Sequence, residues 1–89
     1  MSLLKRFKPT QTARHFNMDK VKGYADKMRK GTWDWSKGKI IVDKAGNIMS
    51  GHHRVLAAEQ AGVSIPKSAI FRTGFLTQRV VQSWADILK

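Results

Sequence analysis

The stretch from residue 39 to residue 62 constrains the fold of this chain more than any other part of the sequence. Residues 39–42 (KIIV) are apolar and β-branched and predict a strand, and the DKAGN that follows is typical of a tight turn. Ile48 and Met49 predict a second short strand, so that the pair forms a hairpin. The run HHRVLAAEQA, directly after Gly51, predicts a helix that ends at Gly62. A hairpin that leads straight into a helix indicates an α+β fold.

Further elements are predicted on both sides of this stretch. A helix begins after Asn17, a good N-cap, and stops at Gly31, and its apolar residues follow helical spacing: Val21, Tyr24, Ala25 and Met28. Residues 70–71 add a short strand, and a last amphipathic helix is predicted from Val80, Val81, Trp84, Ile87 and Leu88. We therefore expect one domain over residues 1–89, in which short strands pack with about three helices. Residues 1–15 form a basic N-terminal segment and residues 16–89 the globular core.

The composition narrows the range of functions. The chain has no cysteine, which excludes disulfides, thiolate nucleophiles and cysteine-based zinc sites. Lys and Arg number 17 against 6 Asp and Glu, and this net charge of +11 favours nucleic acid as the partner. An acidic protein partner is the main alternative, and a merely solubilising surface is a third. No apolar run is long enough to span a membrane, and the first residues do not have the pattern of a signal peptide.

The candidate site is the start of the predicted helix at Gly51, His52, His53 and Arg54. The first N–H groups of a helix are unpaired and the helix dipole is positive there, so this end attracts anions. Gly51 permits close approach to the backbone, and an arginine fork with two imidazoles completes a phosphate site. At helical spacing Glu59 shares a stripe with His52 and is a candidate to orient its imidazole. The alternative interpretation is a capping histidine and an arginine paired with an acid.

Other candidates have two interpretations each. Trp33 and Trp35 lie two residues apart, which places both indoles on one side of an extended segment, either to stack bases or to fill the core. Asp43 is either a turn residue or a metal ligand or base. The N-terminal segment carries further candidates for nucleic-acid contact: Lys5, Arg6, Lys8 and Arg14.

The run IIVDKAGNIMSGHHRVLAAEQAGVSIP resembles the ParB/sulfiredoxin-like superfamily, in which a strand ending in G-x-x-R opens an alanine-rich helix that closes at a glycine. FKPTQTARHF is similar to the N-terminal proline-x-glutamine strand of that superfamily, and the resemblance covers roughly residues 7–71. It implies a small ParB/sulfiredoxin-like fold and a phosphate site to which Gly51, Arg54, Thr10 and Gln11 contribute. Sulfinic-acid repair is excluded, because His52 stands where sulfiredoxins have their cysteine. The second motif of CTP-binding ParB proteins is absent from the sequence.

In its small size, strong basic charge and GHHR motif, the chain resembles the ParB-like nuclease group. These domains are found at the C-termini of bacterial polymorphic toxins of the Rhs and contact-dependent inhibition types. The resemblance implies hydrolysis of phosphodiester bonds in DNA, or less readily RNA, after delivery into the cytoplasm of a competitor cell. One histidine would act as general acid or base, and Arg54 would stabilise charge on the phosphate. A divalent metal such as Mg²⁺, bound by His52 or His53 and by Glu59 or Asp43, is a candidate cofactor. The expected partner besides nucleic acid is an acidic immunity protein.

Three alternatives remain open from the sequence. One is a ββα-metal nuclease of the HNH type, although this chain has no later histidine on the helix to serve as the metal ligand. Another is a non-catalytic nucleic-acid-binding module. The last is a nucleotide-dependent phosphotransferase or kinase that uses the same GHHR site.

Overall fold

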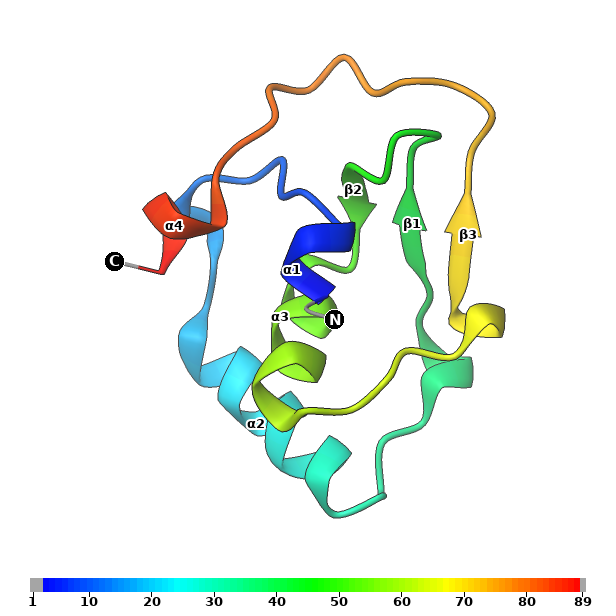
Figure 1. Cartoon of the computed structure of the whole chain (residues 1–89). Helices are drawn as coiled ribbons and strands as arrows, with labels where there is room; N and C mark the ends of the chain where they lie inside the picture. Colours follow the sequence, from blue (N-terminus) through cyan, green and yellow to red (C-terminus); the bar gives the residue numbers. More distant parts are fainter. Residues whose placement is uncertain (1–2, 89) are drawn as a thin grey trace.

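A computed structural model describes residues 3–88 of the chain, and within them it contains four helices and one three-stranded sheet (Figure 1). The helices are α1 (Leu3–Arg6), α2 (Met18–Arg29), α3 (His52–Ala61) and α4 (Trp84–Ile87). The strands are β1 (Ile40–Val42), β2 (Ile48–Ser50) and β3 (Ile70–Arg72). Short 3-10 turns are η1 (Ala13–His15), η2 (Trp35–Lys37) and η3 (Lys67–Ala69). The predicted α+β class is confirmed.

The sheet has the strand order β2-β1-β3. β1 pairs antiparallel with β2, which confirms the predicted hairpin, and β3 lies parallel to β1 with Ile41 opposite Phe71. β2 returns the chain to the end of the sheet where β1 begins, and α3 lies in the connection that passes β1 to reach the parallel strand β3. The C-terminal end of β2 therefore leads through a single residue, Gly51, into α3.

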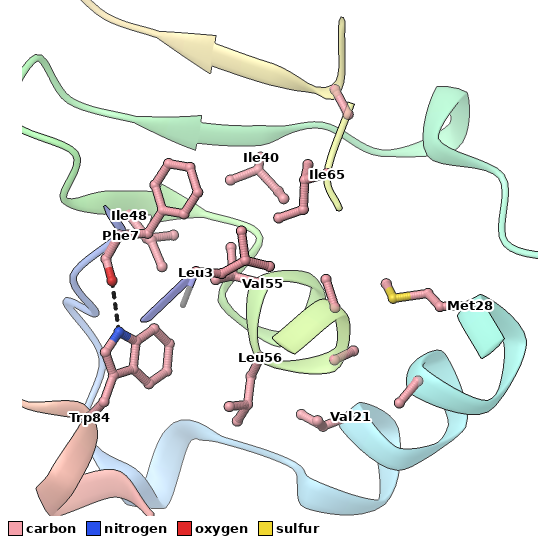
Figure 2. Close-up of a cluster of buried hydrophobic side chains, with 14 of the residues drawn as sticks. Leu3, Phe7, Val21, Met28, Ile40, Ile48, Val55, Leu56, Ile65 and Trp84 are labelled. Carbon is pink, nitrogen blue, oxygen red and sulfur yellow. Dashed lines mark hydrogen bonds between the residues drawn. The ribbon is translucent and has the colours of Figure 1, made fainter. Parts of the chain in front are cut away.

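The hydrophobic core lies between the sheet and the pair of helices α2 and α3 (Figure 2). α2 contributes its predicted apolar stripe, of which Val21 and Ala25 are fully buried. α3 is buried along much of its length, and its side chains Ala57 and Ala58 are small enough for the two helices to approach closely. The start of α3 is thus fixed by packing on both sides.

The N-terminal segment belongs to this core, so the predicted core boundary at residue 16 is wrong. Phe7 and Pro9 are fully buried, and Leu3 packs in the same cluster. Lys8 pairs with the edge of β2: its N–H donates to Gly46 O at 3.1 Å, and its carbonyl accepts from Ile48 N–H at 2.8 Å. The basic residues that lie between the apolar ones obscure this buried pattern in the sequence.

The predicted C-terminal helix is present but much shorter than predicted, because α4 spans only Trp84–Ile87. Ser83 caps α4 by accepting from Ala85 N–H, and the indole Nε1 of Trp84 donates to Phe7 O at 2.7 Å (Figure 2). Residues 73–83, which we call the strap, have neither helix nor strand and cross from β3 to α4 (Figure 1). Val80 is 73% exposed, so its helical spacing to Trp84 does not mark a buried face. No helix among residues 3–88 has the length and apolar character needed to cross a membrane.

Candidate anion-binding site

Gly51 sets the geometry of the site, because a side chain at the junction of β2 and α3 would be strained and crowded. It has φ 94° and lies in the left-handed region that glycine tolerates best. A Cβ atom there would also lie 2.9 Å from Ile40 Cγ1 and 3.1 Å from Ile40 Cα, inside the packing of β1. Glycine thus allows α3 to begin immediately beside the central strand.

The beginning of α3 opens into a hollow of ≈ 270 Å³, which we call the anion hollow. The first helical hydrogen bond runs from Val55 N–H to Gly51 O, so the amides of residues 52–54 have no acceptor within the helix. The hollow is lined by Gln11, Lys20, Tyr24, Met49, Ser50, Gly51, His52, His53, Arg54 and Arg79. Three of these described lining residues are permanent cations and none is acidic. Free amides, the helix dipole and the cations all favour a bound anion.

His52 is buried and acts as an acceptor for the N-terminal segment. Its Nε2 accepts from Thr10 N–H at 3.0 Å, while the Thr10 hydroxyl donates to Ile48 O at 2.6 Å. Burial, reinforced by the charges of Arg79 and His53, lowers the pKa of His52 to about 4. The ring is therefore neutral near pH 7, and the hydrogen bond to Nε2 places its proton on Nδ1. This arrangement favours a structural role for His52 over the predicted role in acid–base catalysis.

His53 makes the equivalent bond at the other end of the same segment. Its Nε2 accepts from Asn17 N–H at 3.0 Å, and its ring lies 5.2 Å from that of Phe16, between centroids. Burial lowers the pKa of this half-buried histidine, and Lys20 and Arg54 lower it further. The two histidines thus hold residues 10–17 across the start of α3. This segment brings Gln11 into the anion hollow, where its buried Oε1 has no partner among the described residues.

The Arg54 side chain reaches from α3 to the segment that precedes β1. A Cβ atom on Gly38 would lie 2.6 Å from Arg54 Cζ, so the guanidinium packs directly on the glycine backbone. It also lies 6.0 Å from the centroid of the Tyr24 ring, a distance typical of a weak cation–π contact. Its Nε is buried and has no partner within residues 3–88. Arg54 is thus preorganised at the edge of the hollow.

Arg79 enters the hollow from the strap, through a chain of hydrogen bonds that starts at Asp43. Asp43 Oδ2 accepts from Thr77 N–H at 2.9 Å, and Thr77 Oγ1 accepts from Arg79 N–H at 3.1 Å. Arg79 Nη1 then donates to Met49 O at 2.8 Å, in the middle of β2. The sequence interpretation missed Arg79, because nothing in its local pattern points to a helix start at His52, 27 residues earlier. It also missed the exposed Lys20 on α2, and it assigned Tyr24, one turn later, only to the apolar stripe.

Asp43 lies away from the hollow and is fully buried. Besides Thr77, it accepts from Ala45 N–H, Asn47 N–H and Asn47 Nδ2, each at 2.9 Å. Burial alone would raise the pKa of Asp43, but these hydrogen bonds outweigh it and lower the pKa to about 2. The turn interpretation of Asp43 therefore fits, and its oxygens are committed to the hairpin and the strap.

Glu59 is not brought together with the histidines. It lies near the other end of α3, where Oε1 accepts from Leu4 N–H at 3.3 Å, and it lines a separate hollow. Residues on one stripe seven positions apart are separated by about 10 Å of helix rise. Since no carboxylate lines the anion hollow, its lining does not fit Mg²⁺, which prefers oxygen ligands. Within residues 3–88, no group of three or more His, Asp or Glu side chains is placed to hold a metal ion.

The remaining candidates lie on other surfaces. Trp33 and Trp35 are half-buried with their ring centroids 5.8 Å apart, which places both indoles together, although η2 begins at Trp35. The basic candidates of the N-terminal segment are all exposed and lie outside the anion hollow: Lys5, Arg6, Lys8 and Arg14.

Comparison with known proteins finds no matching family model, no matching curated protein and no matching solved structure. The ParB/sulfiredoxin-like resemblance therefore stays a prediction from the motif and the order of elements.

Proposed function

We propose that this chain is a nucleic-acid-binding domain that holds a backbone phosphate in the anion hollow. The observation that carries the proposal is the convergence of Lys20, Arg54 and Arg79 on the unpaired amides at the start of α3. The cations come from α2, α3 and the strap, so the fold brings them together from three parts of the chain. Arginine forks match phosphate oxygens in pairs, and a helix start supplies further N–H donors.

The charge of the whole chain supports a polymeric anion over a single small one. The net charge of +11 is far larger than the three cations of the hollow supply. Nucleic acid that binds to such a basic surface releases counterions, and this release favours the complex. The exposed N-terminal residues Lys5, Lys8 and Arg14 would then add contacts to neighbouring phosphates.

The binding test compares Lys20→Gln, Arg54→Gln and Arg79→Gln with wild type, by fluorescence anisotropy of a labelled oligonucleotide over a range of salt concentrations. Each variant should weaken binding by about 5- to 10-fold and reduce the salt slope by about 1, the loss of one phosphate contact. Lys22→Gln is the matched control, because Lys22 is exposed on α2 two residues from Lys20 and does not line the hollow. Equal binding by all four variants would contradict the proposed site.

Cleavage of phosphodiester bonds is the second candidate function, and the position of His53 favours it. This half-buried imidazole lies in the hollow near Lys20 and Arg54, and its bond to Asn17 is at the surface. Its Nε2 must first release Asn17 N–H before that nitrogen can accept a proton from water or a hydroxyl. Arg54 would stabilise the charge that develops on the phosphate.

A plasmid-cleavage assay decides whether this second function exists. If the domain cleaves DNA, His53→Ala and Arg54→Ala should abolish turnover, and His53→Ala should keep most of its affinity for the oligonucleotide. If the wild-type protein binds DNA but does not cleave it, the chain is a non-catalytic binding module. Calorimetric binding of ATP or CTP, without preference for oligonucleotides, would instead favour a phosphotransferase.

The toxin context rests on the resemblance alone and is part of the same proposal. Delivery into a competitor cell predicts that expression of the wild-type chain in a bacterial cytoplasm arrests growth, whereas Arg54→Ala does not. An acidic immunity protein would relieve that arrest by covering the basic surface. Growth unaffected by the wild-type chain would count against the toxin role while leaving nucleic-acid binding intact.

A further inference from the structure

A second hollow adjoins the anion hollow. It measures ≈ 190 Å³ and is lined by Lys27, Thr32, Trp33, Asp34, Lys37, Gly38 and Arg54. Arg54 lines both hollows, and the ring of Tyr24 in the first lies 4.6 Å from that of Trp33 in the second, between centroids. The two hollows are therefore neighbours, divided by one guanidinium and one pair of aromatic rings.

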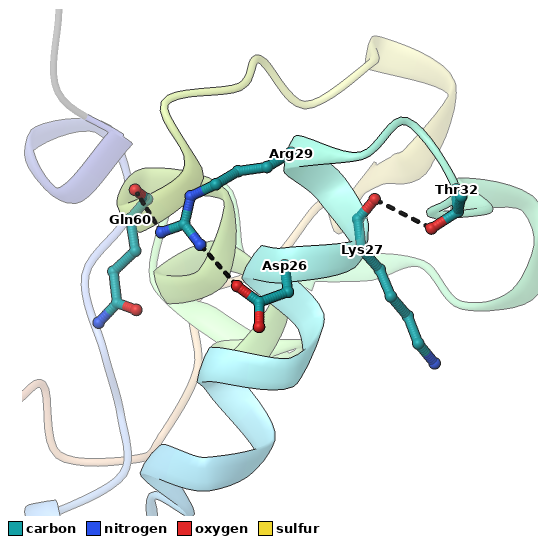
Figure 3. Close-up of polar contacts among 5 residues, drawn as sticks. All are labelled: Asp26, Lys27, Arg29, Thr32 and Gln60. Carbon is teal, nitrogen blue, oxygen red and sulfur yellow. Dashed lines mark hydrogen bonds and ion pairs between the residues drawn. The ribbon is translucent and has the colours of Figure 1, made fainter.

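The wall of the second hollow is held in place from behind. The Trp33 indole contacts the rings of both Tyr24 and Trp35, the latter edge-on at an interplanar angle of 75°. The end of α2 is fixed by Arg29, which donates to Asp26 at 2.8 Å and to Gln60 O on α3 at 3.3 Å (Figure 3). Beside it, Thr32 Oγ1 donates to Lys27 O at 3.2 Å (Figure 3). The aromatic wall is thus placed by ring contacts and by hydrogen bonds at the end of α2.

The polar groups around Trp33 include both donors and an acceptor. Trp33 Nε1 and Arg54 Nε are buried N–H groups without a partner among the described residues. Asp34 is exposed, and hydrogen bonds from the Ser36 hydroxyl and amide lower the pKa of its carboxyl group. Asp34 is therefore a carboxylate acceptor near neutral pH. An aromatic wall with an exposed carboxylate acceptor beside it and unpaired N–H groups beneath its surface suits a nucleobase, which has a π face and edges of both kinds.

We infer that the second hollow binds the nucleobase of the nucleotide whose phosphate lies in the anion hollow. The inference rests on the proposed function and specifies its substrate. A base inside a duplex is paired and stacked, so the preferred ligand is single-stranded nucleic acid or an unpaired end. Arg54, at the boundary, contacts the phosphate on one side and the base on the other.

The test compares two labelled oligonucleotides of equal length, one with normal bases and one abasic, which carry the same phosphates. Wild type should bind the normal strand about 10-fold more tightly than the abasic strand, the effect of one stacked base. Trp33→Leu should bind both strands with the affinity that wild type has for the abasic one, and Trp33→Phe should restore most of the preference. Phe71→Leu is the control, because Phe71 is an exposed aromatic residue on β3 that lines neither hollow.

The outcomes separate the inference from the proposed function. If wild type binds neither strand, the proposed function fails. If wild type binds both strands equally, or if Trp33→Leu keeps the preference for the normal strand, phosphate binding stands and the base site is refuted. Competition with a nucleoside monophosphate shows whether the ligand is a free nucleotide or a polymer. If the monophosphate displaces the strand with an affinity equal to that of the strand, the ligand is a free nucleotide. If it binds much more weakly than the strand, the ligand is a polymer.

Discussion

The anion hollow has two walls that the chain builds in different ways. One wall is the start of α3 against α2, and it is backed by side chains that are fully buried, among them Val21 and Val55. The other wall is the strap, which has no regular structure and several exposed apolar side chains, including Phe75 and Leu76. Hydrophobic packing fixes the first wall, whereas individual hydrogen bonds fix the second.

The hydrogen bonds of the strap are spaced along its whole length. Thr73 N–H donates to Val42 O at 2.9 Å, and Phe75 O accepts from Lys44 N–H at 3.0 Å. Near the other end, Gln82 N–H donates to Pro9 O at 2.8 Å. Since each such bond contributes only about 1 kcal/mol, we expect the strap to open more readily than the helix wall.

The largest expected effect comes from damage to the helix wall at Gly51. Gly51→Ala should lower the free energy of unfolding by about 3 kcal/mol, because the left-handed backbone is strained and the methyl group meets Ile40. Gly62→Ala is the matched control, since Gly62 has φ 69° but open space where the added methyl group would lie, and should cost about 1 kcal/mol. Urea unfolding measures both. Equal losses would show that the contact with Ile40 is unimportant.

A smaller effect is expected from pH, through His52 in the same wall. Its pKa falls from 6.5 in the unfolded chain to about 4 in the folded protein, so protonation favours unfolding. This contribution is complete above about pH 6.5 and is lost as the pH falls toward 4. Lowering the pH from 7 to 5 should therefore reduce the free energy of unfolding by about 2 kcal/mol through His52. The slope of unfolding free energy against pH should be reduced in His52→Gln; an unchanged slope would refute this cause.

The smallest expected effect concerns the strap wall at Thr77. Thr77→Val removes the acceptor for Arg79 N–H, keeps the amide bond to Asp43, and should weaken oligonucleotide binding about 3-fold through misplacement of Arg79. In an Arg79→Gln background the same change should have little effect, because the two residues act together. Thr73→Val is the control, since within residues 3–88 the Thr73 hydroxyl donates to Phe75 O in the same strap and not to Arg79. Additive losses would mean that Thr77 does not position Arg79.

The helix wall was predictable from the sequence because its signals are local. The stripe on α2 and the glycines that bound α3 follow from spacing within each segment, and they predicted the anion site at residues 51–54. Glu59 misled the interpretation because a shared helical stripe says nothing about separation along the axis. The strap wall was not predictable, since Val80 and Val81 have helical spacing and Arg79 depends on Asp43, which lies 36 residues earlier in the chain. The roles of His52 and His53 depend equally on distant partners, Thr10 and Asn17.

The two histidine bonds also affect the order in which the molecule is assembled. The Thr10–His52 bond joins positions 42 residues apart and connects the N-terminal segment to the middle of the chain, and the Asn17–His53 bond joins the N-cap of α2 to α3 across 36 residues. Closure of such long loops costs entropy before the contacts form, so we expect these bonds to form late in folding. A partly folded chain with α2, the hairpin and α3 in place would lack Gln11 across the hollow. Binding competence would therefore arise only with the complete native state, and an incompletely folded domain would remain inactive toward its ligand.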